Sequence, residues 1–206
     1  TNSNWNDNSN WTPVGVPTSS DCVVIPNVTN DPIINGTNYN GLGRSLAVNT
    51  GATLNITATN TATITNAINV NPSGTLIVQD DASIVQTNNV ANTGNIQYNR
   101  SVNVRKQDYV FWSSPVSGFS NSAISPGTNL GYQYKWTPTI PTNTNGFGNW
   151  ASANETMVIG KGYCLRAPDS YSLTTPANYT ATFIGVPNNG NISTPISRGT
   201  YNTAGT

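Results

Sequence analysis

Aromatic residues at alternate positions are the side chains in this sequence best suited to bind a ligand. Three of them alternate with polar residues, and a fourth follows a loop rich in Thr, Pro, Asn and Gly at 137–149. On an exposed strand such rings would stack on sugar rings and form a carbohydrate contact. Aromatics at a period of two are more typical of a core, because each buries a large apolar area, and we expect burial. The four residues are Tyr132, Tyr134, Trp136 and Trp150.

The ionisable residues exclude most catalytic mechanisms. The sequence contains no histidine, so nucleophilic catalysis that depends on a base titrating near neutral pH lacks that base. Glycosidases need only a pair of carboxylates, and Asp80 and Asp81 are the one adjacent acidic pair. Their neighbours in the sequence are neutral polar residues, which favours a solvated turn. We therefore expect a protein that is not an enzyme, with no catalytic residues and no cofactor.

Metal and disulfide chemistry have few candidates. Asp7 lies among asparagines whose amide oxygens are loosely similar to a calcium loop, but one carboxylate makes a poor cage, and we expect no metal site. Cys22 and Cys164 lack the histidine partners of a zinc site. In an oxidising compartment they could form a disulfide that closes a long loop. Two buried free thiols are the alternative, and the sequence does not decide between them.

The bulk composition limits the partners. The chain has 206 residues with 33 Asn and 29 Thr, only 8% charged residues and a formal net charge of zero. Asn favours turns and Thr favours strands, so many short strands are expected. The eight basic residues are scattered, which excludes the concentrated positive surface of a nucleic-acid-binding protein. No apolar run is long enough for a membrane-spanning helix, so we expect no membrane insertion.

Residues 44–100 repeat with a period of about 20 residues. Gly51, Gly74 and Gly94 each precede a pair of apolar residues at alternate positions, namely Leu54 and Ile56, Leu76 and Val78, and Ile96 and Tyr98. Alternation indicates strands with one buried face, and the recurrence indicates coils that stack to bury it. Further apolar residues, up to Ile84 and Val90, are expected to point inward. The repeat predicts a short parallel β-helix, or solenoid, with an evenly spaced β-sandwich as the alternative.

The flanking segments complete an all-β chain of three parts. Residues 1–43 are predicted to form an N-terminal cap and first coil, in which Trp5 and Trp11 cover the open end of the solenoid. Residues 101–206 have larger side chains and longer loops, which favours a β-sandwich or jelly-roll-like domain. The fold class is therefore all-β, with a solenoid at 44–100 followed by a sandwich.

Several short motifs occur in a characteristic order along nearly the whole chain. They are Trp11 with Gly15-Val16-Pro17-Thr18, Asp21 before Val24-Ile25-Pro26, the glycine-containing coils, Lys106-Gln107-Asp108-Tyr109 before Trp112-Ser113-Ser114-Pro115-Val116, Ser125-Pro126, the segment 157–163, and the segment 183–190. In this order the sequence resembles secreted, surface-exposed proteins of Bacteroidota, especially flavobacteria, many of which are exported by the type IX secretion system. The resemblance implies a secreted or cell-surface location. In such proteins further strands and a sorting domain usually follow, so we expect the domain at 101–206 to be incomplete at its C-terminus.

Two functions remain open from the sequence. The first is a non-catalytic structural or adhesive module of an extracellular surface protein, whose partners are other copies of itself or surface proteins and which assembles into filaments. The alternative is a carbohydrate-binding accessory module of a secreted enzyme, whose partner is a polysaccharide. Exposed, coplanar aromatics would favour the alternative, and buried aromatics would favour the first.

Overall fold

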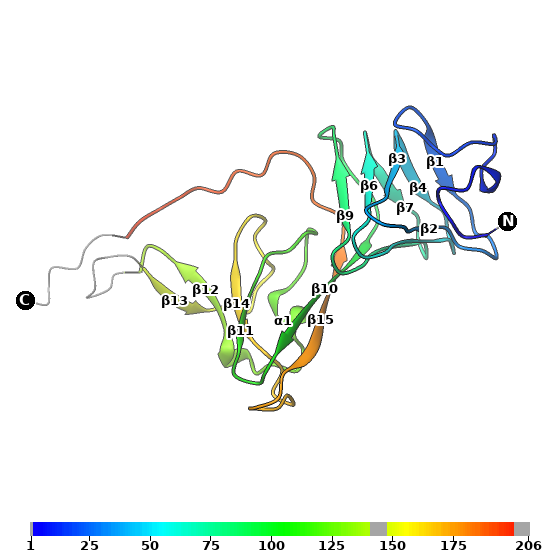
Figure 1. Ribbon diagram of the computed structural model, residues 1–206. Coiled ribbons are helices and arrows are strands. Elements are labelled where there is room, and N and C mark those ends of the chain that lie inside the picture. The colour runs from blue at the N-terminus through cyan, green and yellow to red at the C-terminus, as the bar shows by residue number, and fades with distance from the viewer. Residues whose placement is uncertain (1, 141–147, 200–206) are drawn as a thin grey trace, which may run out of the picture. The chain divides into compact units, whose positions relative to one another are not determined.

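The computed structural model describes residues 2–140 and 148–199 and is almost entirely β (Figure 1). Residue 1, residues 141–147 of the predicted loop and the chain end at 200–206 lie outside the described residues. Internal contacts divide the chain into two compact units. Unit 1 comprises Thr1–Ser101, Pro115–Ser117 and Thr180–Asn191, and unit 2 comprises Val102–Ser114, Gly118–Tyr179 and Ile192–Thr206.

Unit 1 is a β-solenoid of three complete coils, each with three short strands, and β10 begins a fourth (Figure 1). Equivalent strands of successive coils pair in parallel and build three sheets, with the orders β1-β4-β7, β10-β8-β5-β2 and β3-β6-β9. The strand β15 lies next to β10 at the edge of the second sheet. The solenoid prediction is thereby confirmed. The strands are β1 (Cys22–Ile25), β2 (Ile33–Ile34), β3 (Asn40–Gly43), β4 (Ser45–Val48), β5 (Thr53–Ile56), β6 (Thr61–Ile64), β7 (Ile68–Val70), β8 (Thr75–Val78), β9 (Ser83–Gln86), β10 (Ile96–Val104) and β15 (Ala177–Gly185). Residues 102–104 of β10 and 177–179 of β15 belong to unit 2.

The alternating apolar residues of the coils form columns inside the solenoid. Leu54 of β5 pairs in register with Leu76 of β8, and the register of β8 with β10 continues the column to Ile96. All three side chains are fully buried. Because each coil adds one residue to each column, a single coil could not bury its apolar face alone. Two predicted inward positions differ: Ile84 is half-buried, and Val90 is exposed because it lies in the turns after β9.

The recurring glycines are required where one coil passes over the next. A β-carbon at Gly94, whose φ is +77°, would lie 1.8 Å from the carbonyl oxygen of Val70 in the preceding coil. A β-carbon at Gly74 would lie 2.9 Å from the carbonyl oxygen of Val48. Contacts this short are not tolerated, so only glycine allows the coils to stack at these corners.

Neutral amide side chains link successive coils on the outside of unit 1. Asn71 donates to Asn49 at 3.3 Å, and Asn88 donates to Asn66 at 2.7 Å, in each case across 22 residues of sequence. On another side of the solenoid, a row of amide side chains runs from Asn55 through Gln79 to Asn99, joined by hydrogen bonds of 3.1 and 3.0 Å. The Asn-rich composition therefore has a structural role, because an amide can both donate and accept, as Gln79 does in the middle of its row.

Trp5 covers the interior of the first coil. Its side chain is 1% exposed and lies against Gly41, where an added β-carbon would be 3.2 Å from the indole. Trp11 packs edge-on against it with ring centroids 4.8 Å apart and donates its indole N–H to the carbonyl of Trp5. Asn4 bridges to Ile33 and extends the β2 edge. The two tryptophans therefore pack together at this end of the apolar column.

The strands that lie wholly within unit 2 form one antiparallel sheet of the order β11-β14-β12-β13, among the residues the structure describes (Figure 1). One face of this sheet is covered by segments of the same unit, including the single helical turn α1. The predicted second sheet of a sandwich remains a prediction. The elements are β11 (Tyr109–Trp112), β12 (Gln133–Thr137), β13 (Asn149–Ser152), β14 (Tyr163–Arg166), α1 (Asn121–Ile124) and the 3-10 turn η2 (Leu130–Tyr132). A further 3-10 turn, η1 (Asn8–Asn10), lies in unit 1.

Candidate functional site: an aromatic sheet face

One face of the four-stranded sheet in unit 2 carries a continuous group of aromatic side chains. The register fixes this arrangement: Cys164 in β14 lies opposite both Phe111 in β11 and Tyr134 in β12. Trp136 in β12 lies opposite Trp150 in β13. Side chains that are directly opposite one another project from the same face of a sheet. We call this group the aromatic face; it consists of Tyr109, Phe111, Tyr132, Tyr134, Trp136 and Trp150.

The aromatic face is open to solvent. Phe111 is 70% exposed, and Tyr109, Tyr132, Trp136 and Trp150 are each between 38% and 43% exposed. Their rings nonetheless touch one another across the strands. Trp136 and Trp150 meet at 5.3 Å with an interplanar angle of 78°, and Phe111 lies 6.0 Å from Trp150 at 44°. The rings therefore form ridges and not a flat platform.

A cleft of about 360 Å³ opens in the middle of the aromatic face. Its walls are Tyr109 and Tyr134 on one side and Phe111 and Trp150 on the other. Its floor is Cys164, whose small side chain leaves the space that a larger residue would fill. Burial raises the pKa of the Cys164 thiol, so it stays neutral near neutral pH. The lining is thus uncharged and apolar.

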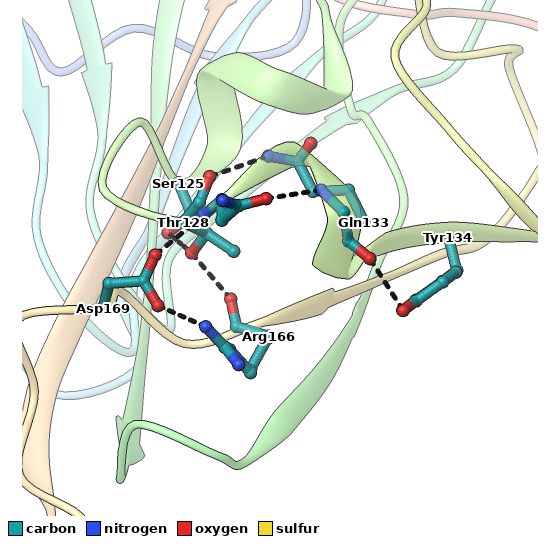
Figure 2. Close-up of polar contacts among 8 residues, drawn as sticks. Ser125, Thr128, Gln133, Tyr134, Arg166 and Asp169 are labelled. Carbon is teal, nitrogen blue, oxygen red and sulfur yellow. Dashed lines mark hydrogen bonds and ion pairs between the residues drawn. The ribbon is translucent and has the colours of Figure 1, made fainter.

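Arg166 is the only charged residue among the positions of the four described strands that share this face. Its guanidinium lies 3.4 Å from the ring centroid of Tyr132, in a cation–π contact, and forms an ion pair with Asp169 (Figure 2). Because Arg166 is engaged at the edge of the face by both partners, its charge is compensated. The aromatic face therefore presents little net charge to a partner.

The opposite face of the sheet holds a buried polar network that fixes β12 and β14. Gln133 is 1% exposed and accepts a hydrogen bond at 2.8 Å from Asn121, which also donates to the carbonyl of Ala153. Thr128 accepts a hydrogen bond from Gln133 at its backbone carbonyl and donates its hydroxyl to the carbonyl of Arg166 at 2.8 Å (Figure 2). Buried polar groups that are fully paired hold their strands in one arrangement. The network on the opposite side of the sheet consequently holds β12 and β14, and with them the aromatic face, in one arrangement.

A second polar group supports β12 near β13. Glu155 accepts hydrogen bonds from the ammonium group of Lys135 and, at 2.9 Å, from the hydroxyl of Tyr163. The hydrogen bond from Lys135 lowers the pKa of the Glu155 carboxyl. Lys135 lies opposite Tyr163 across the strands, so the ion pair forms on the covered side of the sheet.

The structure brings together the four aromatics that the sequence selected as candidate carbohydrate contacts. Tyr132, Tyr134, Trp136 and Trp150 all lie on the aromatic face. The expectation that they form a core is wrong, because the side of β12 that carries Gln133 is the buried side. Three further residues that line the cleft were not selected from the sequence as contact residues. Their only signals were the alternation in Tyr-Val-Phe-Trp and the strand around Cys164. These residues are Tyr109, Phe111 and Cys164.

The other candidates serve local structure. Cys22 and Cys164 are both free thiols, so the disulfide is not formed; Cys164 is buried, as the alternative of two buried thiols requires, whereas Cys22 is exposed. Asp80 accepts a hydrogen bond at 3.0 Å from the backbone of Ser101, and Asp81 occupies a turn with a φ of +59°. Asp7 caps η1 by accepting from the backbone and hydroxyl of Ser9.

Within the described residues, no three His, Cys, Asp or Glu side chains gather as a metal site would require. Nor does any described helix have the length and apolar character needed to cross a bilayer.

Comparison with known proteins identifies a family but no function. Residues 1–206, the whole chain, match the family described as a domain of unknown function, DUF8693. No curated protein and no solved structure matches the chain.

Proposed function

The chain belongs to the DUF8693 family, a domain of unknown function, and from its geometry we propose that it is a non-catalytic contact module of an extracellular adhesive or structural protein. The aromatic face is the contact surface. The observation that carries the proposal is the solvent exposure of this face, with Phe111 70% exposed and two tryptophans about 40% exposed. Contiguous apolar patches of a few hundred Å² on soluble proteins are often interaction sites.

The solenoid supports the same role as a spacer. Each coil of unit 1 contacts only its neighbours, so a stack of coils is a stiff, elongated carrier whose length follows the number of coils. Its outer surface is rich in Asn and Thr side chains, some of which bond to one another between coils, as Asn71 does with Asn49. The secreted or cell-surface location is part of the proposal and is supported by the motif order, the low charge and the resemblance to surface proteins of Bacteroidota.

The absence of catalysis is proposed from the side chains that are present. The sequence has no histidine. Glu155 is held by Lys135 and Tyr163 on the covered side of the sheet, and Asp80 bonds to the backbone of Ser101. The cleft on the aromatic face is lined by rings and by the Cys164 thiol, whose raised pKa makes it a weak nucleophile.

Carbohydrate binding is the second candidate, and the exposure of Trp136 and Trp150 favours it. Both side chains would offer ring faces to pyranose rings. Their planes, however, are inclined by 78°, and the cleft offers almost no hydrogen-bonding groups for sugar hydroxyls. A ridged apolar face suits a ridged apolar partner better than a flat polysaccharide surface. We therefore place adhesion through this face first.

The proposal is tested with beads coated with the full chain. Wild type is expected to clump beads or to retain them on surfaces coated with the protein itself, whereas retention on cellulose, chitin or xylan would favour the carbohydrate-binding candidate. The double variant Trp136→Ser with Trp150→Ser is expected to lose this adhesion while its melting temperature stays close to wild type, because both side chains are exposed. Leu173→Ser removes an exposed apolar side chain of unit 2 outside the aromatic face and is the matched control. Equal adhesion by wild type and the double variant would refute the proposed contact surface.

A further inference from the structure

The sheet of unit 2 has two apolar faces, and the described residues of the unit cover one of them. Behind it, Tyr163 and Leu165 of β14 are buried against segments of the same unit. In front of it, no described segment of unit 2 forms a layer over the aromatic face. Domains are normally built from packed layers, because a sheet with an apolar face must bury that face against another element. Among its described residues, unit 2 therefore lacks the layer that its sequence pattern calls for.

The aromatic face is large enough to form the centre of a protein interface. If a fully exposed aromatic side chain presents about 200 Å², its five most exposed members leave about 450 Å² of aromatic surface in water. A stable interface buries about 800 Å² on each partner, and its core is enriched in aromatic residues. The face thus supplies more than half of one side of such an interface before its polar rim is counted.

Charge and shape make the face complementary to itself. Its one charged strand position, Arg166, is neutralised by Asp169, so two copies of the face would not repel each other. Phe111 protrudes, with 70% of its side chain exposed, directly beside the cleft floored by Cys164. In an arrangement with two-fold symmetry, each copy contributes the same protrusion and the same cleft, so Phe111 of each copy can enter the cleft of the other.

We propose that a second copy of this chain covers the aromatic face, so that the two sheets pack face to face and complete one β-sandwich from two chains. This inference rests on the proposed function and names the partner of its contact surface. Sheets in such packings lie about 10 Å apart with their strands inclined by about 30°. It also accounts for the aromatic alternation that is typical of a core, since the core forms between the chains.

The test is sedimentation of the full chain over a range of concentrations up to about 100 µM. Wild type is expected to shift from monomer to dimer within this range. Phe111→Ser and, independently, Trp150→Ser are expected to raise the dissociation constant at least about tenfold, as truncation of a central aromatic does in other interfaces. Leu173→Ser is the matched control and should leave the dissociation constant unchanged. Both changed side chains are exposed, so the variants are expected to have the same melting temperature as wild type.

Cys164 gives a second measurement. In a chain with Cys22→Ser, the rate at which Cys164 reacts with a thiol reagent is expected to fall as the protein concentration rises, since the partner would cover its cleft. A monomer at every concentration, or a dimer that Phe111→Ser and Trp150→Ser do not weaken, would overturn the proposal. If a monomeric chain still adhered to polysaccharide through Trp136 and Trp150, the second copy would be refuted and the contact surface retained.

Discussion

Truncation of one leucine in the middle of the solenoid tests the stacked core most directly. Leu76 of β8 is fully buried between Leu54 of the coil before it and Ile96 of the coil after it. Leu76→Ala removes three carbon atoms from this column. Substitutions of this kind cost about 2 to 5 kcal/mol, and more where the surroundings cannot collapse into the cavity. Both neighbouring strands are fixed by ladder hydrogen bonds, so we expect about 3 to 4 kcal/mol.

In a unit of this size, each kcal/mol lowers the melting temperature by about 4 °C, so the transition of unit 1 should fall by about 12 to 16 °C. Differential scanning calorimetry can follow it separately from any transition of unit 2. Thr75→Ala, one residue earlier on the outward side of the same strand, is the control and should change stability by less than about 0.5 kcal/mol. If Leu76→Ala melted within about a degree of this control, the reasoning from the column to the stability of the solenoid would be wrong.

Two other predictions concern ionisable groups in unit 2 and the free thiols. Because Lys135 lowers the pKa of Glu155 below its ordinary value of 4.5, the carboxylate stabilises the fold above that value, and this stabilisation is lost as the pH falls through the folded-state pKa. Glu155→Gln should therefore lower the melting temperature at neutral pH and make the melting temperature fall less steeply as the pH is lowered. If the melting temperature of the variant fell with pH as steeply as that of wild type, ionised Glu155 would not be the stabilising group. Exposed Cys22 should react with a thiol reagent much faster than buried Cys164, whose pKa is raised by burial, and a native chain lacking two titratable thiols would refute the free-cysteine assignment.

The solenoid could be predicted because its constraints are local and repeated. Leu54, Leu76 and Ile96 each follow a glycine at a similar distance, and the glycines mark corners where a β-carbon would strike the preceding coil. Each repeat confirms the others, so one irregular coil does not hide the pattern. Val90 misled the prediction because it is a single apolar residue among asparagines, without an alternating partner, and the structure leaves it exposed.

The aromatic face could be selected from the sequence but not placed correctly. Alternation in β12 shows that Tyr134 and Trp136 share a face opposite Gln133, yet it does not show which face the rest of the unit covers. That choice depends on Asn121, which lies 12 residues away and pairs with Gln133 inside the unit. A glutamine with a buried partner looks the same in the sequence as a glutamine in solvent. The contribution of β11 depends on a strand pairing across more than 50 residues, which no local pattern encodes.

The amide rows on the outside of the coils determine how the protein responds to its surroundings. Ion pairs on a protein surface weaken as salt rises, because dissolved ions screen charges beyond about 8 Å at physiological ionic strength. The bonds from Asn71 to Asn49 and from Asn88 to Asn66 join neutral groups, so screening has little effect on them. The chain also has no histidine, the residue whose ordinary pKa lies between about 5 and 8. These amide bonds between coils therefore depend little on electrolyte concentration or on acidity near neutrality, and they would persist in fresh water and in brine.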